Sequence, residues 1–197
     1  MKACTLAGLL LLLALGQPLS AAPAAATVHE LPGDSVWNLP GHFTDQAGRR
    51  FSLSGRRGEP QLVGMFYARC QLVCPLLIET GKSIDRALPA DERARLRVLL
   101  VSLDPLHDTP QVLARTAGEH GVDTRRWTLA RTDGATVRRL AAVLDVHYRQ
   151  LENGEFNHTS ALLLLDGEGR ILARTDRLSS TPDPSFIAAV HAALAAH

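Results

Sequence analysis

Cysteine is scarce in this sequence of 197 residues: there are three, and Cys4 precedes an apolar N-terminal run. If that run is removed as a signal, only Cys70 and Cys74 remain. One close pair cannot form the disulfide framework that stabilises small exported domains, and the small loop between the two would add little as a crosslink. The pair therefore indicates redox or metal chemistry, with a structural disulfide as the alternative.

An excess of charge is also missing. The 21 Lys and Arg residues against 20 Asp and Glu leave a formal net charge of +1. Because the two signs are interspersed, nothing suggests electrostatic attachment to nucleic acid. The length suits one domain with short appendages, and no internal repeat or second domain is visible.

No apolar run is long enough to cross a bilayer. The N-terminal run, Leu6–Leu15, spans about ten residues, whereas a spanning helix needs about 20. Lys2 before it and the small residues of Pro18–Ala26 after it are typical of a secretory signal peptide, with an uncleaved membrane anchor as the alternative. We therefore expect a signal at 1–26, a flexible leader at 27–35, one domain at 36–197, and a location in the periplasm, free or anchored to the inner membrane.

The two thiols lie at a predicted strand-to-helix junction. An apolar run, Leu62–Phe66, indicates a buried strand, and Pro75–Leu88 has apolar residues at helical spacing. Pro75 suits the first helical position, because its missing N–H costs nothing there. The N–H groups and the dipole of a helix start should favour the thiolate of Cys74, which is the form that binds soft metals and attacks disulfides.

Predicted strands alternate with predicted helices along the rest of the chain. The nearly continuous apolar run Leu96–Leu103 predicts a strand covered on both faces, and Asp108 or Thr109 then caps a helix. This order predicts an α/β fold with a mixed central sheet flanked by helices, and the position of the thiols narrows it, by analogy, to a thioredoxin-like fold. The other predicted elements are an N-terminal hairpin of Val36–Leu39 and Arg50–Leu53, a helix at Gln111–His120, a strand at Trp127–Ala130, a helix at Ala135–Leu144, an extended segment at Val146–Leu151, a hairpin of Ala161–Leu165 and Ile171–Thr175, and a helix after Asp183.

Three residues separate the two cysteines, one more than in the Cys-x-x-Cys spacing of disulfide exchange. Positions four apart on a helical turn share a face, so both sulfurs can converge on one metal ion and can also close to a disulfide. Soft thiolates select Cu(I), with Zn(II) as the main competitor. A third ligand must come from elsewhere. Among eight histidines, His158 stands apart, because a loop directly before the strand Ala161–Leu165 could swing it onto the metal; a surface histidine is the alternative.

At three places the sequence resembles the Sco/SenC family of copper proteins. The first is Phe66–Pro75, with the pattern Phe-Tyr-x-x-Cys-x-x-x-Cys-Pro. The second is Val101–Pro110, where Val-Ser-Leu-Asp-Pro continues into Asp-Thr-Pro. The third is His158–Gly167, where His-Thr-Ser leads into an apolar strand and Asp-Gly. The blocks occur in the family's order at similar separations, and the resemblance covers about Trp37 to Leu194.

The resemblance implies a thioredoxin fold and a site of Cys70, Cys74 and His158 that binds one copper ion, as Cu(I) or Cu(II). It implies a role in delivering copper to, or preparing, the binuclear copper centre of cytochrome c oxidase. The expected partner is the copper-bearing subunit of that oxidase or another periplasmic copper chaperone. Some family members are thought to reduce their target's cysteines, which would make Cys70 and Cys74 catalytic, so chaperone and reductase both stay open. One departure is Gln71, where family members often carry proline.

Three charged residues near the thiols have open roles. Asp104 either acts as an outer partner that orients His158 or tunes the metal, or it shapes a turn while Asp108 caps the next helix. His107 is a candidate auxiliary ligand. Arg69, next to Cys70, is either an activating charge or a solvated one.

Overall fold

The structure is a computed structural model that describes residues 30–70 and 73–196. The predicted signal peptide, residues 27–29 of the predicted leader, and Gln71 lie outside the described residues. All the elements described here belong to one unit, Leu31–His197. In the described ranges, no helix is long and apolar enough to cross a membrane.

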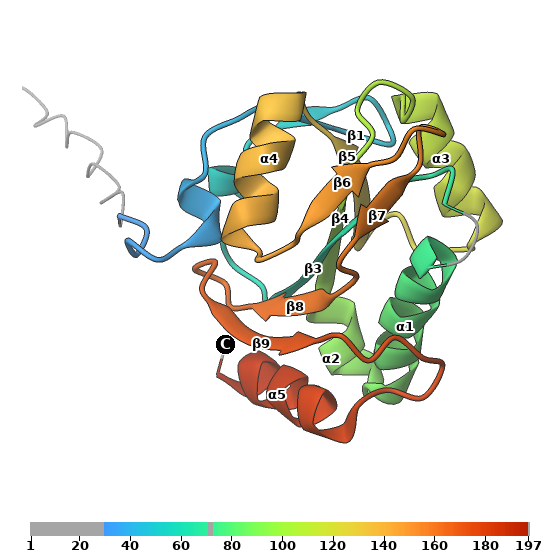
Figure 1. Cartoon of the computed structure of the whole chain (residues 1–197). Helices are drawn as coiled ribbons and strands as arrows, with labels where there is room; N and C mark the ends of the chain where they lie inside the picture. The colour runs from blue at the N-terminus through green and yellow to red at the C-terminus, as the bar shows by residue number, and fades with distance from the viewer. Residues whose placement is uncertain (1–29, 71–72, 197) are drawn as a thin grey trace, which may run out of the picture. The chain divides into compact units, whose positions relative to one another are not determined.

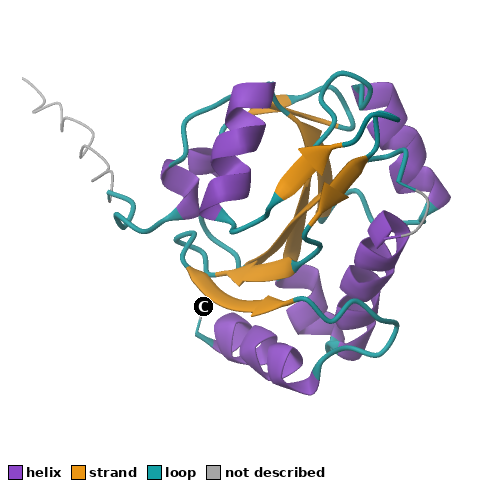
Figure 2. Cartoon of the chain, in the orientation of Figure 1, coloured by secondary structure: helices purple, strands orange, loops and turns teal. Residues whose placement is uncertain are grey.

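A seven-stranded mixed sheet forms the centre of the fold (Figures 1 and 2). Its strand order is β2-β1-β5-β4-β3-β8-β9. The central strands are parallel, and an antiparallel hairpin extends the sheet on each side. The predicted mixed α/β sheet of thioredoxin-like type is confirmed. The strands are β1 (Phe43–Asp45), β2 (Arg50–Phe51), β3 (Gln61–Phe66), β4 (Arg97–Ser102), β5 (Trp127–Arg131), β8 (Leu162–Leu165) and β9 (Ile171–Thr175).

Helices cover both faces of the sheet. Four of them, α1 (Val73–Ala87), α2 (Ala90–Arg95), α3 (Pro110–Glu119) and α5 (Pro184–Ala195), lie on one side of the strands, and α4 (Gly134–Val143) lies on the other (Figure 1). Right-handed crossovers from β3 to β4 and from β4 to β5 place their helices on the same face. From β5 the chain crosses back over β4 and β3 to reach β8, opposite to the direction of the first two crossovers. The helix of this connection, α4, therefore covers the second face of the sheet. Side-chain oxygens of Thr109, Asp133 and Asp183 cap α3, α4 and α5.

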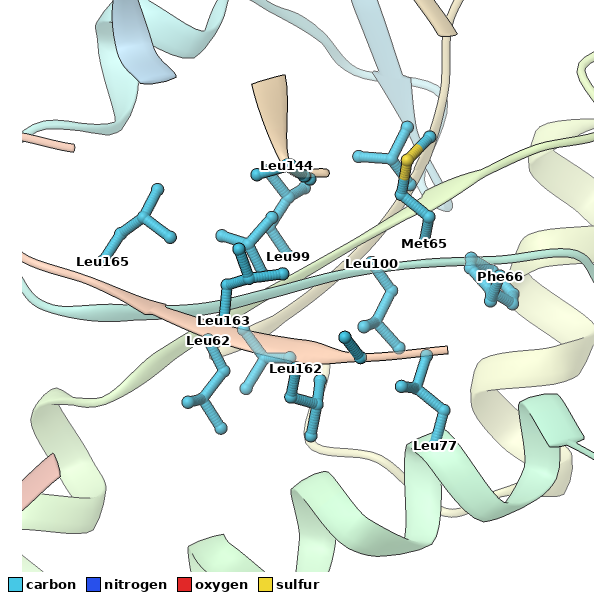
Figure 3. Close-up of a cluster of buried hydrophobic side chains, with 14 of the residues drawn as sticks. Leu62, Met65, Phe66, Leu77, Leu99, Leu100, Leu144, Leu162, Leu163 and Leu165 are labelled. Atoms are coloured by element: carbon cyan, nitrogen blue, oxygen red, sulfur yellow. The ribbon is translucent and has the colours of Figure 1, made fainter. Parts of the chain in front are cut away.

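The core consists of two apolar layers, one on each face of the sheet. Residues two apart on a strand share a face, and paired residues of neighbouring strands do the same. Figure 3 shows Leu77 of α1 below the strands and Leu144, which follows α4, above them. The side chains between them are at most 2% exposed, so β3 and β4 are covered on both sides as predicted. They include Leu62, Leu100 and Leu162 on one face and Val63, Leu99 and Leu163 on the other.

The N-terminal hairpin is present, but its predicted first strand is wrong. Residues Val36–Asn38 form a 3-10 helix, η1. The hydroxyl of Ser35 accepts a hydrogen bond from the Trp37 N–H at 3.1 Å, and the Val36 N–H donates to the carbonyl of Gly169 at 2.9 Å. These bonds close a turn where strand pairing was expected, and β1 and β2 form the hairpin instead. A second 3-10 helix, η2 (Leu53–Arg56), follows it.

Two further differences concern the site. Helix α1 begins at Val73, before the predicted start at Pro75, so Cys74 already lies in its first turn. The strands β6 (Tyr148–Gln150) and β7 (Phe156–His158) form a separate two-stranded sheet, and β7 was not predicted. His158 therefore ends a strand, paired with Tyr148, and does not lie on a loop as expected. An Asn-Gly pair at 153–154 is the hairpin signal that would have revealed β7.

Candidate metal centre

The two cysteines follow the carboxyl end of β3. Cys74 is buried, with 2% of its surface exposed, whereas Cys70 is half-buried. Both are thiols. Each sulfur accepts a backbone hydrogen bond: the Cys74 N–H donates to Cys70 Sγ at 3.3 Å, and the Tyr67 N–H donates to Cys74 Sγ at 3.5 Å. Each of these donors stabilises negative charge on the sulfur that accepts its hydrogen bond.

His158 faces Cys74 from the end of β7, 84 positions along the chain. Its Nε2 lies 3.7 Å from Cys74 Sγ. Its other ring nitrogen, Nδ1, lies 3.1 Å from the carbonyl oxygen of Thr159. A carbonyl can only accept, so Nδ1 carries the hydrogen and Nε2 of the neutral ring holds the lone pair. The ring therefore presents the nitrogen with the free lone pair to the sulfur, with the other nitrogen fixed by a backbone bond.

The separation of these two atoms suits a shared metal ion. A metal bound at about 2.3 Å to sulfur and about 2.0 Å to imidazole nitrogen holds the two atoms roughly 3.7 Å apart at a trigonal angle. Burial lowers the pKa of His158, although its bond to Thr159 acts in the opposite direction. The ring is therefore neutral at physiological pH, as a metal ligand must be.

Cys70 and His158 line one cavity, but Cys70 does not complete a ligand set there. This cavity has a volume of about 250 Å³, and Tyr67 and Phe156 also line it. In the part of the chain that the structure describes, no three His, Cys, Asp or Glu side chains are gathered so that they could hold a metal ion. The fold thus brings Cys74 and His158 together and places Cys70 on the wall beside them.

The protonation of Cys74 differs from the expectation. Burial raises the pKa of the Cys74 thiol, and the adjacent Cys70 raises it further, while the hydrogen bond from Tyr67 opposes both. The helix start was predicted to favour the thiolate, but desolvation of a buried sulfur is the larger effect here. Metal binding or disulfide exchange must therefore displace a proton from Cys74.

Aromatic rings hold the β6–β7 hairpin over the thiols. These ring contacts were not predicted from the sequence. The ring of Tyr67 meets Phe156 edge-on with centroids 5.3 Å apart, and it meets His158 at 5.9 Å. On the other side, Phe156 packs against Tyr148 at 6.2 Å. Edge-on aromatic contacts add to the stability that burial provides. Tyr67 and Phe156 therefore position His158, and their aromatic character was the only signal in the sequence.

Asp104 does not contact His158; it pairs with Arg69 and His107. Its Oδ2 lies 2.7 Å from Arg69 Nη2, and its Oδ1 lies 2.8 Å from His107 Nδ1. Arg69 also donates to the carbonyl of Gly154, in the β6–β7 turn, at 3.3 Å. Arg69 therefore links the loop before Cys70 to Asp104 and to the β6–β7 turn, while 45% of its side chain stays exposed. The ring of His107 is directed at Asp104 and Arg69, which gives no support to its role as an auxiliary ligand.

Asp108 is buried and does not cap α3, in contrast to one of the predicted alternatives; Thr109 does. The Oδ2 atom of Asp108 accepts hydrogen bonds from the Ala68 N–H, at 3.0 Å, and from the hydroxyl of Ser102. Burial raises the pKa of Asp108, and these two bonds oppose the rise. The carboxylates that follow β4 thus hold Ala68 and Arg69, the two residues before Cys70.

Comparison with known proteins agrees with this architecture. The family model described as SCO1/SenC matches residues 35–195. The SCO1 protein homolog of Bacillus subtilis is 24% identical over 157 residues, which cover 78% of this chain and 81% of the relative. The solved structure of ScoI from Bradyrhizobium japonicum, with copper bound, is 22% identical with a TM-score of 0.66, and the match covers 78% of this chain and 97% of that one.

A second solved structure is that of BsSco, in which a disulfide switch was identified and which is described as a member of the Sco family of cytochrome c oxidase assembly proteins. It is 21% identical with a TM-score of 0.69, and the match covers 82% of this chain and 95% of that one. At these identities the two solved structures establish a common fold. The family model spans most of the chain, and the chain therefore belongs to the SCO1/SenC family.

Proposed function

We propose that this protein is a copper chaperone. It binds one copper ion through Cys70, Cys74 and His158 and delivers it to, or prepares, the binuclear copper centre of cytochrome c oxidase. The observation that carries the proposal is the 3.7 Å separation of Cys74 Sγ and His158 Nε2, with Nδ1 of the ring already bonded to a carbonyl. The copper in the related ScoI and the description of BsSco as an oxidase assembly protein support the same role.

The proposed ligands suit a cargo that must be released. Two thiolates and one Cu(I) ion sum to a charge of −1, and the neutral imidazole of His158 adds none. Thiolates are soft ligands that favour Cu(I). A half-buried Cys70 at the cavity leaves one side of the ion open to the thiolates of a partner. Transfer then proceeds by ligand exchange and requires no bond chemistry catalysed by the protein.

The proposal includes a location and a partner. An exported chain with this site would act in the periplasm, free or held at the inner membrane. Its partner would be the copper-bearing subunit of the oxidase or another periplasmic copper chaperone. Export rests on the sequence pattern of residues 1–26.

An anaerobic Cu(I) titration of the reduced protein against a competing chelator tests the site. One equivalent should bind, and His158→Ala should raise the Kd at least about tenfold, because loss of even an outer partner of a metal ligand has effects of that size. The matched control is His147→Ala, whose exposed ring directly precedes β6 and lies 3.8 Å from Asp145. Equal affinity in the wild type and His158→Ala would remove His158 from the site.

A thiol–disulfide reductase is the second candidate, favoured by the unequal exposure of the two thiols. The half-buried Cys70 thiolate would attack a partner disulfide, forming a mixed disulfide and releasing one partner thiolate. Cys74 would then attack the Cys70 sulfur, releasing the second partner thiolate and leaving a Cys70–Cys74 disulfide; two electrons pass to the partner. Turnover on a disulfide substrate, with a trapped mixed disulfide in Cys74→Ser, would support this role. Tight copper binding without such turnover would leave the chaperone role as the single remaining candidate function.

A further inference from the structure

Arginines gather at the end of the central sheet opposite to the thiols. A cavity of about 380 Å³ lies where β3, β4 and β5 begin, whereas the thiols follow the carboxyl end of β3. The cavity is distinct from the proposed copper site, because the two share no lining residue. Five arginines line it, in a protein of net charge +1. They are Arg56, Arg57, Arg97, Arg125 and Arg126.

Three of these guanidinium groups have carboxylate partners. Arg57 lies 3.0 Å from Glu168 and Arg125 lies 2.9 Å from Asp123. Arg126 is held by Asp85, with each of its two terminal nitrogens 2.7 Å from a carboxylate oxygen. These arginines are therefore neutralised within the protein.

Within the described ranges, the side chains of the other two, Arg56 and Arg97, donate hydrogen bonds only to neutral groups. Arg56 donates to Gln61 Oε1 at 2.7 Å and to Thr128 Oγ1 at 3.3 Å. Arg97 donates to the carbonyl of Ala94 at 3.1 Å. No carboxylate of the described residues lies within ion-pair distance of either one. The cavity therefore holds two arginines without an ion-pair partner among the described residues, and the one carboxylate in its lining, Glu59, is paired with Arg95 at 3.1 Å.

The sheet directs these two arginines to the same space. Gln61 pairs with Arg97 in the parallel register, and Thr128 pairs with Leu99, two residues further along β4. The side chains of Gln61, Arg97 and Thr128 consequently share one face of the sheet. Arg56 reaches over that face from η2, and its guanidinium lies 5.5 Å from the ring centroid of Phe51. The guanidinium is held in place by its two hydrogen bonds and by the Phe51 ring before any ligand binds. Its other N–H groups are available to a ligand.

Placing these two charges together has an energetic cost. Burial, and to a smaller extent the nearby charge of Arg97, lower the pKa of Arg56 to about 10 against the opposing effect of Asp45. The two guanidinium groups carry charge of the same sign, so they repel each other in a partly buried setting. An anion between them would convert this repulsion into two attractive contacts.

We propose that Arg56 and Arg97 bind a phosphate group, either free or as the ester of a small molecule or a lipid headgroup. The planar guanidinium fork matches the oxygens of phosphate and bonds them in pairs. A phosphate monoester carries a charge of about −1.5 to −2 at neutral pH, which largely balances the two arginines, whereas the phosphodiester of a lipid headgroup carries one negative charge and balances one of them. The cavity volume falls within the range of about 300–1,000 Å³ of small-molecule sites, so it has room for the remainder of an ester.

Thermal unfolding of the full chain in increasing inorganic phosphate, with ionic strength held constant by chloride, tests the proposal. The Tm should rise with phosphate concentration, because a ligand that binds the folded state stabilises it. Arg56→Gln and Arg97→Gln should each raise the apparent Kd at least about tenfold, the effect expected for a lost charge-assisted bond. The control is Arg115→Gln, an exposed arginine on α3, which should respond like the wild type.

A second measurement separates the ligand role from a structural one. In buffer free of phosphate, Arg97→Gln should keep or raise the Tm, because it removes a repulsion and only one bond to a carbonyl. A structural arginine would show a lower Tm. Cys70→Ser should keep the full phosphate response, because the thiols are at the other end of the strands.

Sedimentation with lipid vesicles distinguishes the sources of the phosphate. Vesicles of phosphatidylcholine alone are compared with vesicles that contain phosphatidylglycerol. A Tm response to free phosphate without selective vesicle binding assigns a soluble phosphate. Binding to phosphatidylglycerol vesicles that is lost in Arg56→Gln and Arg97→Gln assigns a lipid headgroup. Absence of both responses, or responses that both variants retain, would overturn the proposal.

Discussion

Arg69 and Asp104 form an ion pair, with Arg69 Nη2 2.7 Å from Asp104 Oδ2. The pair connects the residue before Cys70 to the loop after β4, and only 3% of the Asp104 side chain is exposed. Arg69 extends the link to the carbonyl of Gly154 in the β6–β7 turn. The two elements that carry the proposed ligands are thus tied together by one guanidinium, outside the ligand set itself.

Replacing Asp104 should weaken copper binding without removing a ligand. In Asp104→Asn, Arg69 and His107 lose their carboxylate, and Cys70 is held less firmly beside Cys74. We expect the Kd for Cu(I) to rise about tenfold, the lower end of the effects of outer partners, measured by chelator competition. Asp91→Asn on the exposed surface of α2 is the control. If both variants bind like the wild type, Asp104 has no positioning role.

The same carboxylate should give the protein an acid-dependent stability. Burial raises the pKa of Asp104, but hydrogen bonds from Arg69 and His107 outweigh burial and hold it below its usual value. A carboxyl group whose pKa is lower in the folded than in the unfolded state stabilises the fold. This contribution is fully present above the pKa of the unfolded state, about 3.9, and it is lost as the pH falls through the pKa of the folded state. The difference in unfolding free energy between the wild type and Asp104→Asn should therefore shrink on acidification below about pH 5. Urea unfolding at a series of pH values measures it, and a constant difference would contradict it.

Copper affinity should rise steeply with pH. Copper binds both sulfurs as thiolates, and burial raises the pKa of Cys74, so its proton is still present at neutral pH and must leave on binding. Burial lowers the pKa of His158 against the effect of its bond to Thr159, so the neutral ring releases no proton. We expect log Kd to fall by at least about one per pH unit between roughly pH 6 and 8, and we expect this slope to be about one smaller in Cys74→Ser. A break in the slope near the ordinary His pKa, about 6.5, would show that His158 is protonated in the free protein.

The two thiols should differ in reactivity. Cys70 is half-buried beside the cavity, whereas Cys74 is 2% exposed and burial raises its pKa. Since the thiolate is the nucleophile, iodoacetamide should modify Cys70 at least about tenfold faster than Cys74, as followed by mass spectrometry of the reduced protein. Cys74→Ser should keep the fast phase and Cys70→Ser should lose it. Equal modification rates for the two cysteines in the folded protein would contradict the half-buried position of Cys70 and the buried position of Cys74.

Two helical glycines should respond oppositely to alanine. A Cβ at Gly81 of α1 would lie 2.7 Å from the Trp127 ring, whereas at Gly118 of α3 it would meet nothing within 4 Å. Gly81→Ala should lower the unfolding free energy by about 1–3 kcal/mol, because the buried indole cannot move away easily. Gly118→Ala should raise it by about 0.5–1 kcal/mol through helix propensity. Denaturant unfolding measures both, and a stabilised Gly81→Ala would mean that α1 can shift from Trp127.

Much of the central architecture could be read from local patterns. The apolar run Leu62–Phe66 is a strand, because β3 is buried on both faces and needs no alternation. The helix that starts after Asp183 was predicted from its cap and proline, and both occupy those positions. Short elements were harder to predict. Residues Val36–Asn38 form a helical turn because of bonds to Ser35 and Gly169, and the second of these partners is distant in the sequence.

The sequence by itself determined where the two thiols stand, at the end of a buried strand and the start of a helix, because strand burial and helix starts depend on neighbouring residues. The resemblance of three sequence blocks also singled out His158. Only the tertiary structure decided that His158 Nε2 meets Cys74 Sγ, that Asp104 holds Arg69 rather than His158, and that Cys74 retains its proton. Each of these depends on contacts between distant segments or on desolvation by the folded core, which no local pattern specifies.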